Sequence, residues 1–236
     1  MNILFALITL LLPSTISYPS NYNFVIWNVG QGSWATLIEK DSCLHIDMGG
    51  ERAPYSLILK RCEKRKNKIL LTHLDNDHIN KIKSFKLNVQ HLCLFPHNFI
   101  ELKTKKYWLN KIEPCKGTHS SVKVIHRPYL SKNKNQSSIV YVVKNKILIS
   151  GDSPSSEEKK WSKKVPKSVS ILVLGHHGSI TSTSKKLLKE SSFDLAVASA
   201  RRKRFGHPHK KIEERLKKFK VPLIVTQEWG HIYFYL

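Results

Sequence analysis

The sequence predicts an α/β protein of the α+β type, in which helices cover two β-sheets. Two observations support this prediction: short runs of β-branched and aromatic residues recur along the 236-residue chain, and amphipathic helical patterns separate the later runs. The early runs follow one another as strands of hairpins do, whereas the later ones alternate with helices. An all-β sandwich is therefore a poorer description.

The expected strands are short, and most are rich in Val, Ile, Leu or aromatic residues. In chain order they are residues 24–29, 35–38, 43–47, 69–72, 138–143, 146–150, 170–174, 194–198, 222–226 and 231–235.

The clearest helical pattern is PHKKIEERLKKF, with Pro208 at the first helical position. Its apolar residues are spaced to share one face and are Ile212, Leu216 and Phe219. A second helix is expected to start near Thr183, with Leu187 and Leu188 on its inner side.

The charge of the chain is strongly positive. It has 40 Lys+Arg against 17 Asp+Glu, a formal net charge of +23, while 41% of its residues are hydrophobic. That apolar content suffices for a packed core and argues against a disordered tail protein. A surface this basic favours nucleic acid or anionic membrane as a partner over a small neutral substrate.

The first 17 residues read as a signal peptide, an apolar stretch followed by small polar residues with Thr15 and Ser17 at the −3 and −1 positions. An uncleaved membrane anchor is the alternative, although the apolar run 3–12 is shorter than the roughly 20 residues that span a bilayer. Because no repeat or long linker follows, residues 18–236 are expected to form one domain. With the signal peptide removed and no second apolar run of spanning length, this domain is expected to be secreted or periplasmic, without stable membrane association.

The cysteines have an oxidising compartment available if the chain is exported. Four cysteines allow three pairings, which the sequence does not rank, and Cys43 could equally be a buried free thiol. No C-x-x-C pair occurs, which argues against a cysteine zinc site. The four are Cys43, Cys62, Cys93 and Cys115.

Three expected strands run directly into residues that bind metals. Such strand ends are expected to meet at one cleft, where clustered carboxylates and imidazoles favour one or two divalent cations. Alone, the segment HLDNDH could be a polar loop with an Asp helix cap, but GD and GHHG each close a further strand. The residues are His73, Asp75, Asp77 and His78, then Gly151 and Asp152, then Gly175, His176, His177 and Gly178.

HLDNDH resembles the H-x-H-x-D-H motif of the metallo-β-lactamase superfamily, with Asp75 in place of the second histidine. Further motifs in the same order resemble the C-terminal nuclease-like domain of ComEC-type DNA-uptake competence proteins: NVGQGS, HIDMGG, LISGD, LGHHGSITSTS and FGHPH. The likeness runs from about Asn28 to the end. In that family the domain is joined to a multispanning channel protein, so the resemblance implies a free-standing, exported version.

The resemblance implies a four-layer αββα fold with a metal site at one edge of the β-sandwich. Carried over by position, His73 and Asp75 would bind a first ion, Asp77 and His78 a second, Asp152 would bridge the two, and His176 would complete the second site. A metal-activated hydroxide would be the nucleophile. The Asp75 carboxylate shifts the expected metal from Zn²⁺ alone toward Mn²⁺.

Asp77, His177 and His207 are the expected catalytic residues. His177 and His207 would contact the phosphate or the leaving oxygen, His207 because Gly206 and Pro208 hold it at a helix start. An ordinary N-terminal helix residue is the alternative for His207.

The sequence also departs from the family pattern. Asn28 and Ser33 stand where carboxylates are usual, Asn135 is the nearest polar residue where the superfamily has a histidine ligand, and Arg204 stands near a usual Asn. Because the histidine ligand is missing near Asn135, a one-metal site is an alternative to the two-metal site.

Basic residues next to FGHPH are expected to hold the phosphates that flank a scissile bond. Tryptophans could add base-stacking surfaces, or could belong to the core. The basic residues are Arg201, Arg202, Lys203, Arg204, Lys210 and Lys211; the tryptophans are Trp34, Trp108, Trp161 and Trp229.

These features predict an exported metal-dependent phosphodiesterase, a nuclease acting on single- or double-stranded DNA, with RNA also possible. Two alternatives stand beside it: a hydrolase of a lactam, a thioester or another substrate that is not a nucleic acid, and a catalytically weak basic DNA-binding protein related to DNA uptake. The sequence leaves the oligomeric state open, as well as the choice between internal and terminal cleavage.

Overall fold

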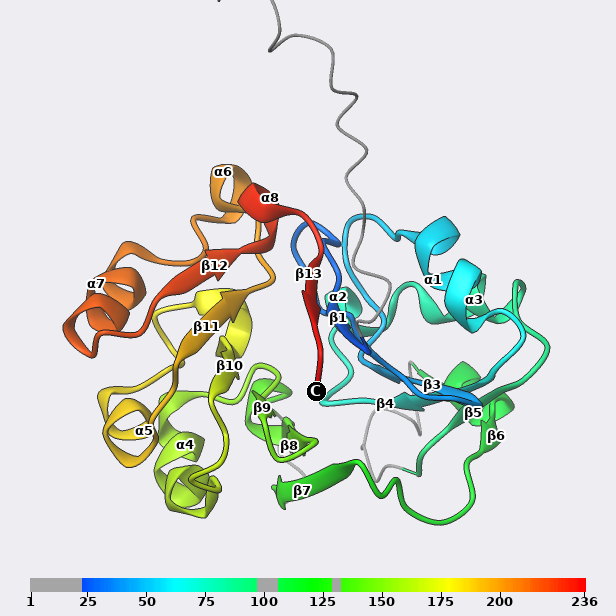
Figure 1. The fold of residues 1–236 in the computed structure, drawn as a ribbon, viewed down its shortest axis with the longest axis horizontal. Helices are drawn as coiled ribbons and strands as arrows, with labels where there is room; N and C mark the ends of the chain where they lie inside the picture. The colour runs from blue at the N-terminus through cyan, green and yellow to red at the C-terminus, as the bar shows by residue number, and fades with distance from the viewer. Residues whose placement is uncertain (1–22, 97–105, 129–132) are drawn as a thin grey trace, which may run out of the picture.

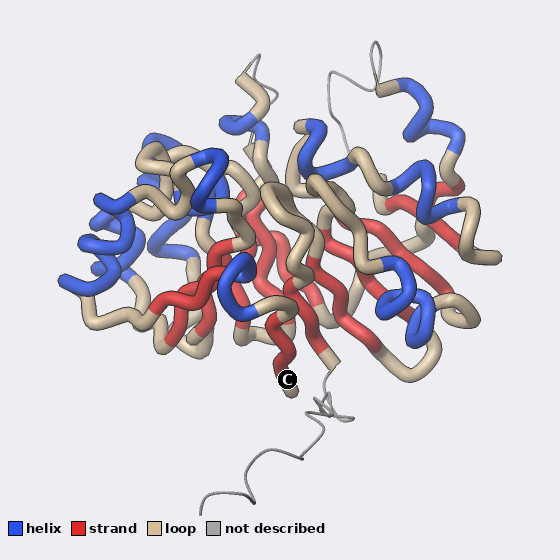
Figure 2. Tube along the Cα trace, turned by 90° about the horizontal axis from the view of Figure 1, so that it is seen from above, coloured by secondary structure: helices blue, strands red, loops and turns tan. Residues whose placement is uncertain are grey.

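The computed structural model describes residues 23–96, 106–128 and 133–236, so the predicted signal peptide lies outside the described residues. Two sheets face each other, with α1 and α3 outside one and α4, α5 and α7 outside the other (Figure 1). Seen from above, the strands run through the middle with helices on either side (Figure 2). The predicted four-layer αββα architecture is therefore confirmed.

The seven-stranded sheet has the order β13-β1-β2-β3-β4-β5-β6. Antiparallel pairing joins the first four of these strands, and parallel pairing joins the last four. The strands are β1 (Phe24–Ile26), β2 (Ala35–Ile38), β3 (Ser42–Ile46), β4 (Lys66–Leu70), β5 (Leu92–Leu94), β6 (Glu113–Pro114) and β13 (Ile232–Phe234). The helices between them are α1 (Tyr55–Cys62), α2 (Asn76–Ile79), α3 (Ile82–Lys86) and the 3-10 helix η2 (Tyr107–Lys111).

The six-stranded sheet has the order β12-β11-β10-β9-β8-β7, in which β9 to β12 are parallel. Its strands are β7 (Val122–His126), β8 (Val140–Val143), β9 (Ile147–Ile149), β10 (Ile171–Val173), β11 (Leu195–Ala198) and β12 (Leu223–Val225). Its helices are α4 (Ser155–Trp161), α5 (Lys185–Glu190), α6 (Arg202–Phe205), α7 (Lys210–Lys218) and α8 (Thr226–Trp229), with 3-10 turns η3 (Asn135–Ser137), η4 (Ser162–Lys164) and η5 (Gly175–Gly178).

Every predicted strand is present, but the sequence did not predict β5, β6 or β7. These three lie toward the sheet edges, and two of them carry few buried residues: β6 has only two residues, both exposed, and β7 has one buried residue in VKVIH. Such strands lack the apolar pattern that marks a core strand.

The start of α7 corrects the sequence prediction. The helix begins at Lys210, after the N-cap His209, whose Nδ1 accepts the backbone N–H of Lys211. Pro208 therefore precedes the helix, and His207 is not at a helix start. Ile212 and Leu216 are buried on the inner face as predicted, whereas Phe219 lies at the C-cap and is only partly buried against the same cluster. The second helix, α5, has Ser184 as its N-cap and buries Leu187 and Leu188.

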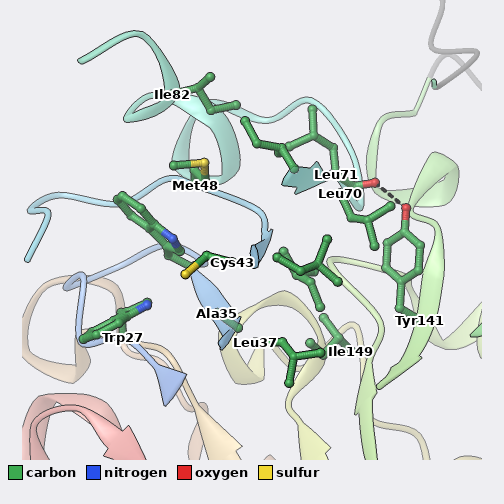
Figure 3. Packing of buried hydrophobic residues seen from close by; sticks show 14 of the residues in the cluster. Trp27, Ala35, Leu37, Cys43, Met48, Leu70, Leu71, Ile82, Tyr141 and Ile149 are labelled. Atoms are coloured by element: carbon green, nitrogen blue, oxygen red, sulfur yellow. Dashed lines mark hydrogen bonds between the residues drawn. The ribbon is translucent and has the colours of Figure 1, made fainter. Parts of the chain in front are cut away.

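The main core lies between the sheets and joins residues from both (Figure 3). Tyr141 of β8 reaches across it and donates a 2.9 Å hydrogen bond to the carbonyl of Leu71, just after β4. A second apolar cluster fills the space between the six-stranded sheet and its helices; it includes Trp161, Leu187, Leu188, Ile212 and Leu216.

Burial divides the tryptophans considered for base stacking. Trp34 and Trp161 are 1% and 0% exposed and belong to the core. Trp108 is half-buried with the Lys83 ammonium over its ring, while Trp229 is 69% exposed.

All four cysteines form disulfides, Cys43 with Cys62 and Cys93 with Cys115. Cys43 is thus not a free thiol. The first bond ties β3 to the end of α1, and the second ties β5 to the residue after β6. In the described part of the chain, no helix combines the length and the apolar character needed to cross a bilayer.

Candidate metal centre

The predicted histidines and aspartates meet at the carboxyl ends of β4, β9 and β10, where the two sheets face each other. His73 to His78 follow β4, Asp152 follows β9, and His176 and His177 lie in η5 after β10. Parallel strands deliver their carboxyl ends to one edge, which is why these distant segments share a site.

Asp152 stands at the middle of the centre and is 3% exposed. Its Oδ2 lies 3.6 Å from His73 Nε2 and 3.5 Å from His176 Nε2. Its Oδ1 lies 3.2 Å from His78 Nε2 and 3.9 Å from His177 Nε2. The two oxygens of one carboxylate therefore face two different pairs of imidazoles.

Asp75 and Asp77 extend these two sets. Asp75 Oδ2 lies 3.7 Å from His73 Nε2, and Asp77 Oδ2 lies 3.1 Å from His177 Nε2. Tetrahedral ligands about 2.1 Å from an ion lie about 3.4 Å from one another, so the separations around Asp152 match a metal shell.

Hydrogen bonds on the far side of each ring orient the imidazoles. The Nδ1 of His78 donates to Asp47 Oδ2 at 2.8 Å, and that of His177 donates to the Ser199 carbonyl at 3.0 Å. Thr72 Oγ1 uses its hydrogen on Asp47, so it accepts from His73 Nδ1 at 3.0 Å. With Nδ1 protonated, the neutral form of each ring has its lone pair on Nε2, the nitrogen on the side of Asp152.

Three of these atoms, the Nε2 of His73, His78 and His177, are buried without a hydrogen-bond partner in the described structure. Leaving a buried acceptor unpaired is costly, and a cation removes that cost. Two sets of side chains place their ligand atoms within 4.8 Å of one another: His73, His78 and Asp152, and Asp77, His78 and His177. The donor set fits a divalent metal.

The turn that carries GHHG puts His177 where His176 was expected. His176 and His177 have φ of 51° and 56°, a left-handed pair that points the His177 ring inward onto Ser199 and Asp77. His177 is 4% exposed, and its ligand atom lies near those of Asp77 and His78. The His176 ring is 28% exposed and approaches Oδ2 of Asp152. Nδ1 of His176 lies 3.1 Å from Thr181 Oγ1.

Charge in the centre is balanced between imidazoles and carboxylates. Burial alone would lower the pKa of His78, but the carboxylates of Asp152 and Asp47 raise it well above its usual value. Burial alone would raise the pKa of Asp152, but His78, His73 and His177 lower it well below its usual range. Protons thus occupy the place that a metal cation would take, and metal and protons compete for it.

Asp47 is a residue that sequence reasoning did not single out. It accepts from the Thr72 backbone N–H and the Thr72 hydroxyl, each at 2.8 Å, as well as from His78. Its left-handed φ of 55° and its full burial hold it there. The available signal was its place in HIDMGG, as the last residue of the predicted strand 43–47.

His207 lies beside the centre, with its ring centroid 6.1 Å from that of His176. Its Nδ1 is 3.2 Å from Nε2 of Gln31, a second residue that sequence reasoning missed within NVGQGS. Burial, and then the neighbouring His177 and His176, lower the pKa of His207.

The segment around Asn135, where the resemblance would place a histidine ligand, brings Lys134 to the centre instead. Lys134 Nζ lies 3.2 Å from Asp75 Oδ1. Asn135 is in η3, and Ser138 Oγ accepts the backbone N–H of Asp152. Asn28 and Ser33, which stand where carboxylates are usual, form hydrogen bonds with the backbone. The Asn28 Oδ1 accepts the backbone N–H of Gly30, and the backbone N–H of Ser33 donates to the Asp77 carbonyl.

The predicted phosphate-binding arginines have carboxylate partners. Arg201 and Arg204 each lie 2.9 Å from Glu51 Oε1, and Arg202 pairs with Glu213 and Glu228. For Lys203, Lys210 and Lys211 we find no ion pair with any residue that the structure describes.

No protein-family model matches the chain. Recombination protein 2 of Haemophilus influenzae is 28% identical over 245 residues, covering 95% of this chain and 30% of that protein. ComE operon protein 3 of Bacillus subtilis is 25% identical over 205 residues, covering 78% and 26%. The chain thus spans less than a third of the length of these relatives.

Among solved structures, the metallo-β-lactamase fold protein YhfI from Bacillus subtilis superposes with a TM-score of 0.59 at 12% identity, covering 89% of this chain and 99% of that one. The chain has the metallo-β-lactamase fold, and the centre described above lies at the edge of its sandwich.

Proposed function

We propose that this metallo-β-lactamase-fold protein is a metal-dependent phosphodiesterase that acts on DNA, related to the ComEC-type nuclease-like domains. The observation that carries the proposal is the placement of Asp152 between two sets of imidazoles, three of whose Nε2 atoms are buried and unpaired.

The two carboxylate oxygens of Asp152 define two sets of metal ligands. An imidazole Nε2 has one lone pair, so His78 serves a single ion. One ion would take His73, Asp75, His176 and Asp152 Oδ2. The other would take Asp77, His78, His177 and Asp152 Oδ1. His176 then supplies the imidazole that the segment around Asn135 lacks.

Mixed imidazole and carboxylate ligands suit Zn²⁺ or Mn²⁺. A divalent ion held there supplies a water of lowered pKa and neutralises charge on a phosphate.

The remaining groups act on the substrate. The Lys134 ammonium and the His207 ring border the centre and donate hydrogen bonds to a phosphate or to the leaving oxygen. Lys203, Lys210 and Lys211 hold neighbouring phosphates, with Arg201, Arg202 and Arg204 contributing where phosphate displaces their carboxylates.

The net charge of this chain and the names of its relatives favour DNA over other substrates of the fold. The net charge of +23 suits a polyanion. The relatives are named for recombination and for the ComE operon. RNA carries the same phosphodiester and is a second polyanionic substrate to test. The disulfides favour an oxidising compartment, consistent with export through residues 1–17.

A second candidate function is a DNA-binding protein with a weak metal centre. Lys134 motivates it, because an ammonium beside Asp75 competes with a cation for that carboxylate.

The deciding experiment incubates purified protein with labelled single-stranded DNA, double-stranded DNA and RNA, with Mn²⁺, Zn²⁺ or chelator. We expect metal-dependent cleavage that chelator and Asp152→Ala abolish. The control Asp194→Ala, which replaces an exposed aspartate directly before β11, should retain cleavage. DNA retention without cleavage under every metal condition would favour the binding protein. Cleavage of neither nucleic acid, with turnover of a lactam or thioester, would favour a different hydrolase.

A further inference from the structure

Gln31 joins two motifs that the metal centre leaves unused, NVGQGS and FGHPH. The Gln31 side chain, in a residue 7% exposed, is bonded at both ends of its amide. Oε1 accepts the backbone N–H of Arg201 at 3.1 Å, and Nε2 lies 3.2 Å from His207 Nδ1.

The orientation of this amide follows from its partners. A backbone N–H can only donate, so the atom that meets Arg201 N must be the carbonyl oxygen, and the NH₂ group faces His207. Because the NH₂ group donates, His207 Nδ1 must accept. A neutral His207 therefore carries its proton on Nε2.

The backbone around Gln31 holds the amide in place. Its own N–H donates to Glu51 Oε2 at 3.1 Å. Gly30 and Gly32 flank it with φ of 77° and 139°, and a Cβ on Gly32 would come within 2.7 Å of the Asp77 carbonyl. The loop thus follows a path, against the metal-binding segment, that other residues would strain.

The hydrogen-bonding pattern of His207 is the reverse of that in three of the histidines that face Asp152. His73, His78 and His177 donate from Nδ1 and present a lone pair on Nε2. His207 accepts at Nδ1 and presents an Nε2–H, which has no partner among the described residues. A hydrogen there prevents metal ligation through Nε2 and suits donation to a phosphate oxygen, which only accepts.

We propose that Gln31 is a positioning residue that fixes the tautomer of His207, so that His207 acts as a hydrogen-bond donor to the substrate phosphate rather than as a metal ligand. The contact between His207 and a substrate phosphate rests on the proposed phosphodiesterase function. The tautomer of His207 does not depend on that function.

Gln31→Glu tests the inference, because a carboxylate still accepts from Arg201 but can only accept from His207, which must then donate from Nδ1. Gln227→Glu is the matched control: Gln227 Oε1 accepts the backbone N–H of Arg202, the residue after Arg201, at 2.7 Å, and the charge change is the same. No contact joins Gln227 to His207 in the described structure.

The first readout is the tautomer, from ¹⁵N NMR of histidine-labelled, Zn²⁺-loaded protein at pH 8. We expect a proton on Nε2 of His207 in the native protein and in Gln227→Glu, and a proton on Nδ1 in Gln31→Glu. A native His207 with its proton on Nδ1, or with the shift of a metal-bound nitrogen, would overturn the proposal.

The second readout is kinetic. Gln31→Glu should lower kcat about 100-fold, the lower end of what loss of one transition-state donor costs, with KM changed far less and Gln227→Glu within about twofold of native. In a His207→Ala background the Gln31→Glu change should cost nothing more. An equal loss with and without His207 would show a merely structural role. If the native protein cleaves no phosphodiester, the proposed function fails while the tautomer measurement still decides the role of Gln31.

Discussion

His78 donates from Nδ1 to the Asp47 carboxylate at 2.8 Å, while Nε2 of the same ring lies 3.2 Å from Asp152. One imidazole thus connects the sheet framework at the end of β3 with the centre of the proposed metal site. Because Asp47 itself accepts two further hydrogen bonds from Thr72, its position is fixed before any metal binds.

Asp47→Asn should weaken metal binding about 10- to 100-fold, since the amide no longer stabilises the Nδ1–H of His78 as a carboxylate does. Competition against a chromophoric chelator measures the affinity. Asp41→Asn, at an exposed position between β2 and β3, is the control. Equal affinities for the native protein and Asp47→Asn would contradict this role.

His176→Ala should reduce the bound metal from two ions to one, because His176 meets only the Oδ2 side of Asp152. His177→Ala should remove the other ion, the one that Asp77 shares. Elemental analysis after dialysis against Zn²⁺ or Mn²⁺ gives the stoichiometry. A native protein that holds one ion, still held after His176→Ala, would indicate that Lys134 replaces the first metal.

Acid should destabilise the fold through His45. Burial lowers the pKa of this fully buried imidazole to about 4, although its hydrogen bond to Asn67 opposes the shift. A folded pKa below the unfolded value of about 6.5 contributes stability above pH 6.5 that is lost as the pH falls through 4, by about 3 kcal/mol in all. In the metal centre, neighbouring carboxylates raise the pKa values of His73 and His78 instead, so these two histidines titrate with the opposite sign.

Comparison with His45→Gln separates the two effects. The difference in unfolding free energy between native protein and variant, from urea titrations in chelator at several pH values, should shrink from pH 6.5 to pH 4. A difference that stays constant with pH would mean that His45 becomes protonated without cost in the folded protein.

Glu51→Gln should strengthen DNA binding at low salt by about tenfold, because it frees Arg201 and Arg204 from Glu51 Oε1. The slope of log affinity against log salt should steepen by up to about 1.8, for two added phosphate contacts. Fluorescence anisotropy with labelled DNA and metal-free protein measures both. Glu190→Gln is the control, because it removes one negative charge from the end of α5. It should change the DNA affinity and the salt slope only by the effect of one unit of net charge.

Each disulfide should contribute about 3 kcal/mol, because the bonds close loops with separations of 19 and 22 residues. Cys43→Ala/Cys62→Ala and Cys93→Ala/Cys115→Ala test them separately by urea unfolding. Cys43 and Cys62 are both fully buried, so their replacement should also loosen core packing and cost more. Similar losses from the two double variants would argue against that packing contribution.

The sequence by itself determined the strands that form the core and the side chains that form the centre. Apolar runs ending in HLDNDH, GD and GHHG predict a shared edge, because parallel strands place their carboxyl ends together. Edge strands such as β7 were not predicted, because a strand with one buried residue in five has no alternating apolar pattern.

Only the tertiary structure decided which nitrogen of each ring faces the centre and which arginines are already paired. Those outcomes depend on partners far away in the chain: Ser199 behind His177, Asp47 behind His78, Gln31 behind His207, and Glu51 across from Arg201. Hydrogen-bond direction and charge pairing are set by atoms within about 3 Å, and such contacts between distant segments exist only once the two sheets have packed.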